Sequence, residues 1–397
     1  MFKFIHTSDW HLGQNFYGYD RLEEQADFLR QLAEIVETER PDALLVSGDI
    51  YHTAAPSSGA VAMYVKAMLD IHAACRSMTI VVIAGNHDSA SRLESDGPLW
   101  ELAGVKVLGG IARDGDGLAD LERHIIKVGD KGIVAAVPFA HPISFPRIAE
   151  GSPDDRQQAY FQALLDRVSQ HNEGQLPVAL MAHLAVSHCD YTGHDRNMEM
   201  ECVEIGALGT GYDYAALGHI HRPQQLDSRT RYCGTPVAVS FDEQCQHSVS
   251  IVTIEQHGAV PQVTTRSITN LKPLHTIPAN GAVELDEALS RVQSRSDVKG
   301  AYIRLNVLVD RYLPSGTQEL AAKVVSEQGG RLCEIKKTAR CAIEATAKQM
   351  TLEEFNRKTP IEVANQYYLE NTGQEMSEQE QEMFNYIFQS VSDENRQ

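Results

Sequence analysis

The chain has 397 residues, of which 43% are hydrophobic and 22% charged, and its formal net charge at pH 7 is −19. This length favours roughly two to three globular domains, and the acidity argues against a protein that binds polyanions indiscriminately. No apolar run approaches the roughly 18 residues of a membrane span, and no basic N-terminal segment precedes an apolar one. We therefore expect a cytoplasmic protein without a membrane segment.

The N-terminal part of the chain alternates between short apolar runs and amphipathic stretches. Residues 2–6, 43–46 and 79–84 are apolar runs closed by glycine or polar residues, a pattern typical of buried strands. Residues 22–36 and 57–74 lie between these runs and have apolar residues at helical spacing. Strand, helix and strand in this order predict a parallel sheet.

Two more apolar runs, residues 177–181 and 214–217, extend the strand pattern. Each of the five runs leads directly into residue types that bind divalent metal ions. In chain order these segments are Asp9-Trp10-His11, Gly48-Asp49, Gly85-Asn86-His87-Asp88, Ala182-His183 and Gly218-His219-Ile220-His221. Because ligands of parallel sheets gather at the carboxyl ends of the strands, we expect all five segments to converge on one rim of a sheet.

The polar side chains of these segments are oxygen and imidazole donors, and no cysteine is among them, which disfavours thiophilic metal chemistry. These potential ligands exceed what one tetrahedral site uses and suit two adjacent ions that share a carboxylate. Two ions about 3.5 to 4 Å apart can bind one phosphate, activate a bridging water and stabilise the leaving oxygen. The segments together therefore predict phosphoester hydrolysis. We interpret the following histidines outside them as surface or core residues: His6, His72, His124, His141, His171, His247, His257 and His275.

Three strand-like runs continue beyond the last of these segments, at residues 231–233, 248–255 and 260–268. Leu271-Lys272-Pro273 then indicates a domain boundary. A small α/β pattern follows, in which the expected helices and strands alternate at residues 284–292, 301–308, 316–327 and 331–337.

From residue 351 the pattern changes to three helix starts in series, each marked by a capping box. The boxes pair Thr351 with Glu354, Thr359 with Glu362, and Ser377 with Glu380. Charge changes too: residues 272–345 have eleven Lys and Arg against nine Asp and Glu, whereas residues 351–397 have three against ten. We therefore expect three parts, at residues 1–270, 271–346 and 347–397.

The ordered pattern D-x-H, G-D, G-N-H-D, H, G-H-x-H resembles the calcineurin-like metallophosphoesterase family over residues 1 to about 268. Residues 5–13 and 48–52, and Gly234-Thr235-Pro236 followed by Ser240-Phe241, are similar to the nuclease branch that processes DNA breaks. The resemblance implies an α/β (α+β) fold of layered β-sheets flanked by helices. It also implies a small α/β capping domain and a C-terminal helical tail.

The resemblance implies a role for each of the polar residues. Asp9, His11 and His221 would hold one metal ion, Asn86, His183 and His219 would hold a second, and Asp49 would bridge the two. His87 would face the scissile phosphate, and His52 would be a second active-site histidine. Asp88 could orient His87 or cap a turn. The family's usual activator is manganese, which mixed nitrogen and oxygen ligation allows, and magnesium is the alternative.

The same branch implies partners. The chain would act on DNA, as a double-strand exonuclease and a single-strand or hairpin endonuclease, together with a coiled-coil ATPase. It would form a homodimer within a heterotetramer, with residues 57–74 as a dimer element. The tail would dock on the ATPase, or alternatively pack as a helical hairpin on its own domain.

Two other functions are considered. A calcineurin-like phosphatase or phosphodiesterase on a non-DNA substrate would need neither His52 nor the 125 or so residues after the metal-binding segments. A non-catalytic scaffold with a decayed site would not need the complete set of ligand residues and His87. The nuclease is therefore the favoured function.

Overall fold

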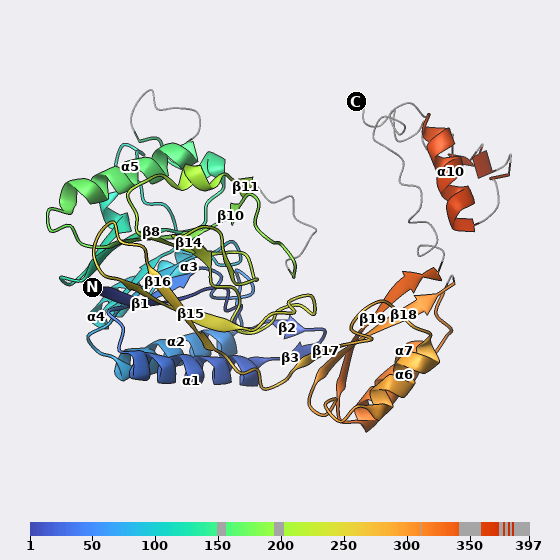
Figure 1. Cartoon of the computed structure of the whole chain (residues 1–397). Helices are drawn as coiled ribbons and strands as arrows, with labels where there is room; N and C mark the ends of the chain where they lie inside the picture. The colour runs from blue at the N-terminus through green and yellow to red at the C-terminus, as the bar shows by residue number, and fades with distance from the viewer. Residues whose placement is uncertain are drawn as a thin grey trace. The chain divides into compact units, whose positions relative to one another are not determined.

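The computed structural model describes residues 1–148, 156–193, 202–310, 312–340 and 359–372, and single residues between 376 and 384. The chain divides into two compact units, Met1–Pro273 and Leu274–Gln397 (Figure 1). The first unit contains all five candidate metal-binding segments, and each unit has its own hydrophobic core.

Two six-stranded sheets form the centre of the first unit. The first sheet has the order β16-β15-β1-β4-β5-β6, and β1, β4, β5 and β6 are parallel. Its strands are β1 (Phe2–Thr7), β4 (Ala43–Ser47), β5 (Thr79–Ile83), β6 (Val105–Leu108), β15 (Ser248–Ile254) and β16 (Gln262–Ser267). The parallel sheet expected at the N-terminus is therefore confirmed, and β15 extends it in the antiparallel direction.

The second sheet has the order β13-β14-β12-β9-β8-β7. Its strands are β7 (Ile125–Val128), β8 (Gly132–Val137), β9 (Val178–His183), β12 (Tyr214–Gly218), β13 (Gln224–Gln225) and β14 (Thr230–Tyr232). Strands β8, β9, β12 and β14 are parallel. Two short pairs lie outside the sheets: β2 (Asn15–Phe16) with β3 (Tyr19–Asp20), and β10 (Ala185–Val186) with β11 (Cys202–Val203).

Helices cover the outer faces of the two sheets, and the inner faces pack on each other (Figure 1). Helices α1 (Leu22–Glu39) and α2 (Ser58–Ala74) lie on the first sheet, and α5 (Arg156–His171) lies on the second. Shorter helices are α3 (Ala90–Glu94), α4 (Gly97–Leu102), η1 (Glu122–His124), η2 (Pro142–Ser144) and η3 (Ile205–Leu208). The predicted α/β class with layered sheets flanked by helices is confirmed.

The expectation that all five segments follow strands of one sheet was wrong, because β9 and β12 belong to the second sheet. Phe4 and Leu45 of the first sheet are buried in one inner cluster with Met181 and Ala216 of the second. A strand buried on both faces has the same apolar pattern whether its sheet is covered by a helix or by another sheet. The sequence pattern therefore identified the strands but did not assign them to their sheets.

His6 lies on β1 between the sheets, and its Nδ1 is 3.0 Å from the Tyr214 hydroxyl. Burial, aided by the charge of Arg231, lowers the pKa of His6 to about 3. In the unfolded chain the pKa of His6 returns to about 6.5. Below that pH, His6 is therefore protonated in the unfolded chain but stays neutral in the folded chain. Stability should therefore fall as the pH is lowered.

We expect this single group to cost about 2 kcal/mol of unfolding free energy between pH 7 and pH 5. Urea titration of wild-type protein and of His6→Gln at both pH values measures the effect, because the variant should lose less stability on acidification by about that amount. If wild type and variant lose the same stability between the two pH values, His6 does not contribute in this way.

The second unit is a three-stranded parallel sheet with two helices. Its strands are β17 (Leu274–Ile277), β18 (Tyr302–Val309) and β19 (Arg331–Ala339), and its helices are α6 (Leu285–Ser294) and α7 (Thr317–Glu327). The expected helices and strands are all present, and β17 is an additional strand. Val292 of α6, Val325 of α7 and Leu305 of β18 are buried in one hydrophobic core.

Helix α10 (Pro360–Thr372) begins at a capping box, as predicted. Thr359 donates from its backbone N and Oγ1 to Glu362 Oε2, at 2.7 and 2.8 Å. The box of Ser377 and Glu380 forms in the same way, with the Ser377 N and Oγ donating to Glu380 Oε2. The box of Thr351 and Glu354 lies outside the described residues. Within the described part of the chain, none of the helices combines the length and apolar character that crossing a bilayer requires.

Candidate metal centre

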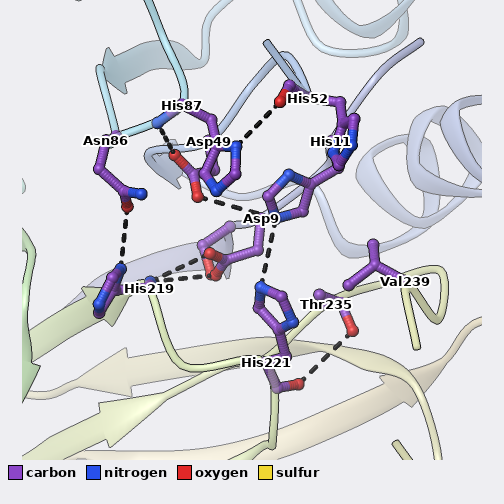
Figure 2. Close-up of polar contacts among 12 residues, drawn as sticks. Asp9, His11, Asp49, His52, Asn86, His87, His219, His221, Thr235 and Val239 are labelled. Atoms are coloured by element: carbon purple, nitrogen blue, oxygen red, sulfur yellow. Dashed lines mark hydrogen bonds and ion pairs between the residues drawn. The ribbon is translucent and has the colours of Figure 1, made fainter. Parts of the chain in front are cut away.

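The five polar segments converge at the carboxyl ends of strands from both sheets. Figure 2 shows side chains from four of them. Asp9 and His11 follow β1, Asp49 follows β4, and Asn86 follows β5, all in the first sheet. The second sheet supplies His183, the last residue of β9, and His219 and His221 after β12. The structure thus brings together all seven residues expected to be ligands, although they come from two sheets.

Asp9, His11 and His221 form one buried group, in which one potential ligand atom from each residue lies within 4.8 Å of the others. The Nε2 atoms of His11 and His221 are 3.3 Å apart. His221 Nδ1 donates to Glu243 Oε1 at 3.2 Å, and Nε2 is the ring nitrogen of His221 that faces His11.

Asn86, His183 and His219 form a second group. The Asn86 Oδ1 is 2.9 Å from His183 Nε2 and 2.9 Å from His219 Nδ1. Asp49 lies between the two groups: its Oδ2 is 3.7 Å from His11 Nε2 and 3.5 Å from His183 Nε2. One carboxylate oxygen therefore faces a histidine of each group.

The backbone is strained where these side chains are presented. Asp9, His11 and Asp49 have φ values of 54°, 46° and 52°, and His219 has 102°. Such conformations are uncommon for residues other than glycine and concentrate at functional sites. Gly85 permits the close approach of the segments, because a Cβ there would lie 2.1 Å from Asp49 Oδ1.

The donor set fits divalent cations. His183 Nδ1 donates to the Ser47 carbonyl at 2.8 Å, so Nε2 carries a lone pair, and this lone pair faces the acceptor oxygen of Asn86. Two acceptors at hydrogen-bond distance repel each other unless a proton or a cation lies with them. Burial lowers the pKa of His183, which disfavours the proton. A cation held by both atoms resolves the conflict.

The carboxylates point to the same conclusion. Asp9 and Asp49 are almost completely buried, and burial raises the pKa of both above the ordinary value. Burial, together with the neighbouring His221 and His87, lowers the pKa of His11 well below the ordinary value. At Asp9, Asp49 and His11 the site thus penalises the charged carboxylate and imidazolium forms, and a bound divalent cation would favour carboxylate and neutral imidazole together. His221 is the exception, because burial is outweighed by the contact with Glu243, which raises the pKa of His221 to about 9.

His87 and His52 lie beside the two groups with their rings stacked, at 5.7 Å between centroids. His87 Nδ1 donates to the His52 carbonyl oxygen at 2.9 Å, so its Nε2 is the atom left for other partners. The backbone N of His87 donates to Asp49 Oδ1 at 2.9 Å. These contacts fix the His87 ring next to His11, whose centroid is 4.9 Å away (Figure 2).

Asp88 holds loops together and does not orient His87. Its carboxylate accepts from the backbone N of Gly85 at 2.9 Å, Ile50 at 3.0 Å and Tyr51 at 2.9 Å. The partner of the His87 ring is instead the carbonyl of His52. Asp88 therefore fastens the loop after β5 to the loop after β4, which settles the alternative that the sequence left open.

The sequence analysis did not identify Glu243 as a residue of the site, and it assigned no function to Thr235, which lies next to it. The Thr235 backbone N donates to the His221 carbonyl at 3.0 Å, and its hydroxyl donates to Glu243 Oε2 at 2.5 Å. The only sequence signal was the family resemblance of residues 234–241. The eight histidines interpreted from the sequence as surface or core residues belong to no metal-ligand group among the described residues.

Comparison with known proteins agrees with this geometry. The family model described as "Calcineurin-like phosphoesterase" matches residues 2–223, more than half of the chain. The chain belongs to this family.

Among the calcineurin-like phosphoesterases, the chain is similar to curated proteins that are named as the SbcD component of the nuclease SbcCD. The protein from Rhodobacter capsulatus is 32% identical over 342 residues, covering 81% of this chain and 84% of the relative. The protein from Escherichia coli K12 is 27% identical over 413 residues, covering 97% and 96%. A dimetal phosphatase from Danio rerio overlaps 66% of this chain and 98% of its own, at 15% identity and a TM-score of 0.37. This member of the SbcD branch is thus a metal-dependent phosphodiesterase.

Proposed function

We propose that the protein is a manganese-dependent DNA nuclease that hydrolyses phosphodiester bonds with two metal ions and acts with an SbcC-type ATPase in DNA break and hairpin processing. The observation that carries the proposal is the position of Asp49 Oδ2, within 3.7 Å of histidines from both ligand groups. The names of the curated relatives supply the nuclease activity and the second component of the complex.

Asp9, His11 and His221 are assigned to one ion, Asn86, His183 and His219 to the other, and Asp49 to both. When bound, the ions would polarise a phosphate oxygen and supply a nucleophilic water at neutral pH. The proposal favours manganese over magnesium, because four of these seven ligands are imidazoles and magnesium prefers oxygen ligands and water.

His87 is assigned to the phosphate and not to a metal ion. Its Nδ1 donates to the His52 carbonyl oxygen, which leaves Nε2 for the substrate. A proton on Nε2 would make this atom a donor to the leaving oxygen or to the charged phosphate. His52 lies on the same side, and both rings are half-buried and thus accessible to a substrate. These two histidines would act on the substrate while the buried carboxylates and imidazoles hold the ions.

The nuclease would assemble as a homodimer within a heterotetramer with the ATPase. Residues 271–346 are proposed to form the capping domain, and residues 347–397 the tail that binds the ATPase. Both assignments rest on the family resemblance and on the tail sequence. Its apolar residues Met383, Phe384, Ile387, Phe388 and Val391 recur at roughly four-residue spacing, and all but the first two lie outside the described residues.

Deletion of residues 377–397 tests the tail. Apolar residues at this spacing suit an amphipathic helix in the groove of a partner. We expect the shortened chain to keep manganese-dependent cleavage of short single-stranded DNA and to lose co-purification with the ATPase. Aggregation of the shortened chain, with no affinity of the full-length chain for the ATPase, would instead show that the tail belongs to the chain's own core.

One assay separates the proposed nuclease from the alternative phosphatase. Purified full-length protein is incubated with manganese and either linear duplex DNA or p-nitrophenyl phosphate esters. Shortening of the DNA supports the nuclease, hydrolysis of the esters alone supports a phosphatase or phosphodiesterase on another substrate, and inactivity on both contradicts the assignment. His221→Ala serves as the control, because removal of a ligand should abolish either activity.

A further inference from the structure

A buried carboxylate lies directly behind His221, outside the seven proposed ligands. Glu243 is 7% exposed as a residue, and its side chain is completely buried. Its Oε1 is 3.2 Å from His221 Nδ1, and the other ring nitrogen of His221 faces His11. Glu243 therefore contacts the far side of a ring whose near side belongs to the metal centre.

Three donors converge on the Glu243 carboxylate. Besides His221, the backbone N of Val239 donates to Oε1 at 3.2 Å, and the Thr235 hydroxyl donates to Oε2 at 2.5 Å. Thr235 is itself fully buried and its backbone N donates to the His221 carbonyl at 3.0 Å (Figure 2). The carboxylate is thus held by its own loop before any substrate or ion arrives.

The loop that carries Glu243 is built to approach His221 closely. Gly234 has a φ of 74°, and a Cβ at that position would lie 2.5 Å from the His221 carbonyl oxygen. Phe241 packs on Phe16 of the β2–β3 pair with 5.3 Å between ring centroids, which fixes the other end of the loop. Both the backbone and the side chain of His221 are therefore held by residues 234–243.

We infer that Glu243 is a positioning residue that fixes the tautomer and ring orientation of His221, so that Nε2 presents its lone pair to a metal ion. The inference rests on the proposed role of His221 as a ligand. A metal-bound histidine whose second ring nitrogen donates to a carboxylate is held in one orientation and is a stronger ligand, and loss of such a partner typically lowers metal affinity about 10- to 100-fold.

Manganese titration of the full-length chain by calorimetry tests the inference without reference to activity. Glu243→Ala should weaken one of two manganese sites by about 10- to 100-fold and leave the other unchanged. Glu243→Gln keeps an oxygen that can accept from His221 but loses the charge, so its affinity should fall between those of wild type and Glu243→Ala. Gln is also close to Glu in size, so this variant remains informative if Glu243→Ala does not fold.

Asp213 provides a matched control. It is also a buried carboxylate that pairs with a histidine, with its Oδ2 2.8 Å from His257 Nδ1, and it accepts from the backbone N of Val178. Asp213→Asn should lower the melting temperature of the metal-free chain without changing either manganese affinity. An equal loss of affinity in Asp213→Asn and Glu243→Ala would overturn the inference, because it would reflect general destabilisation.

His221→Ala separates this inference from the proposed function. Loss of one manganese site in His221→Ala, with wild-type affinity in both Glu243 variants, contradicts only the positioning role. Two intact manganese sites in His221→Ala contradict the ligand assignment itself. If manganese affinity falls in Glu243→Gln and falls further in Glu243→Ala, while Asp213→Asn keeps wild-type affinity, the result supports both the ligand role of His221 and the positioning role of Glu243.

Discussion

Asp49→Ala should remove nearly all bound manganese, whereas His11→Ala or His183→Ala should each remove about one ion per chain. The reason is the position of the Asp49 carboxylate, whose Oδ2 lies 3.7 Å from His11 Nε2 and 3.5 Å from His183 Nε2. Each of those histidines belongs to one ligand group, but the carboxylate faces both. Metal analysis of the three purified variants after dialysis against trace manganese measures the difference.

The Asp49 variant should also lose cleavage by at least about 10³-fold, because a two-ion site stabilises both the attacking and the leaving oxygen. Asp88→Asn is a suitable control for the loop itself, because Asp88 fastens the same loop through Ile50 and Tyr51 without facing either histidine group. Metal losses of about one ion in all three ligand variants would disprove the bridging role.

His87→Asn is expected to lower the rate of cleavage by about 10² to 10⁴ while both ions remain bound, because general acid catalysis by a positioned histidine typically contributes that much. His87 donates from Nδ1 to the His52 carbonyl, which leaves Nε2 to act on the phosphate. Asparagine is smaller than histidine and cannot transfer a proton at neutral pH. Single-turnover cleavage and metal analysis of the same protein sample provide both readouts.

The competing possibility is that His87 binds metal, because His11, His52 and His87 also place ring nitrogens within 4.8 Å of one another. In that event metal content and cleavage would fall together in His87→Asn. His52→Asn is the matched comparison: if His52 acts only on the substrate, its metal content should also equal that of wild type.

Much of the fold was predictable because the strands that carry the site are buried and short. Each of the five predicted runs is a strand in the structure, and their polar ends were located to within two residues. What could not be predicted was the partner of each strand. Leu45 and Met181 are apolar residues of two different sheets that are buried in one core. The sequence of an apolar run does not show whether a helix or another sheet packs on the strand.

The candidate site, like the fold, was predictable only in part. The seven proposed ligands stand out in the sequence because each follows a strand, but the residues that hold them do not. Glu243 is preceded by Asp242 in a loop, and nothing in the sequence distinguishes the buried carboxylate from its neighbour. Asp88 likewise contacts Ile50 and Tyr51, which lie 38 and 37 positions away, through backbone atoms that every residue has.

Because the ligands are divided between two sheets, a newly synthesised chain can become active only late in its folding. Under the proposed assignment, each ion takes ligands from the first sheet and from the second, and these ligands lie far apart along the chain. A nascent chain that has formed only the N-terminal parallel strands β1, β4, β5 and β6 has Asp9, His11, Asp49 and Asn86, but neither ion site is complete. Hydrolytic capacity therefore arises only when the two layers dock, so a truncated or half-folded chain poses little danger to the DNA of the cell that makes it.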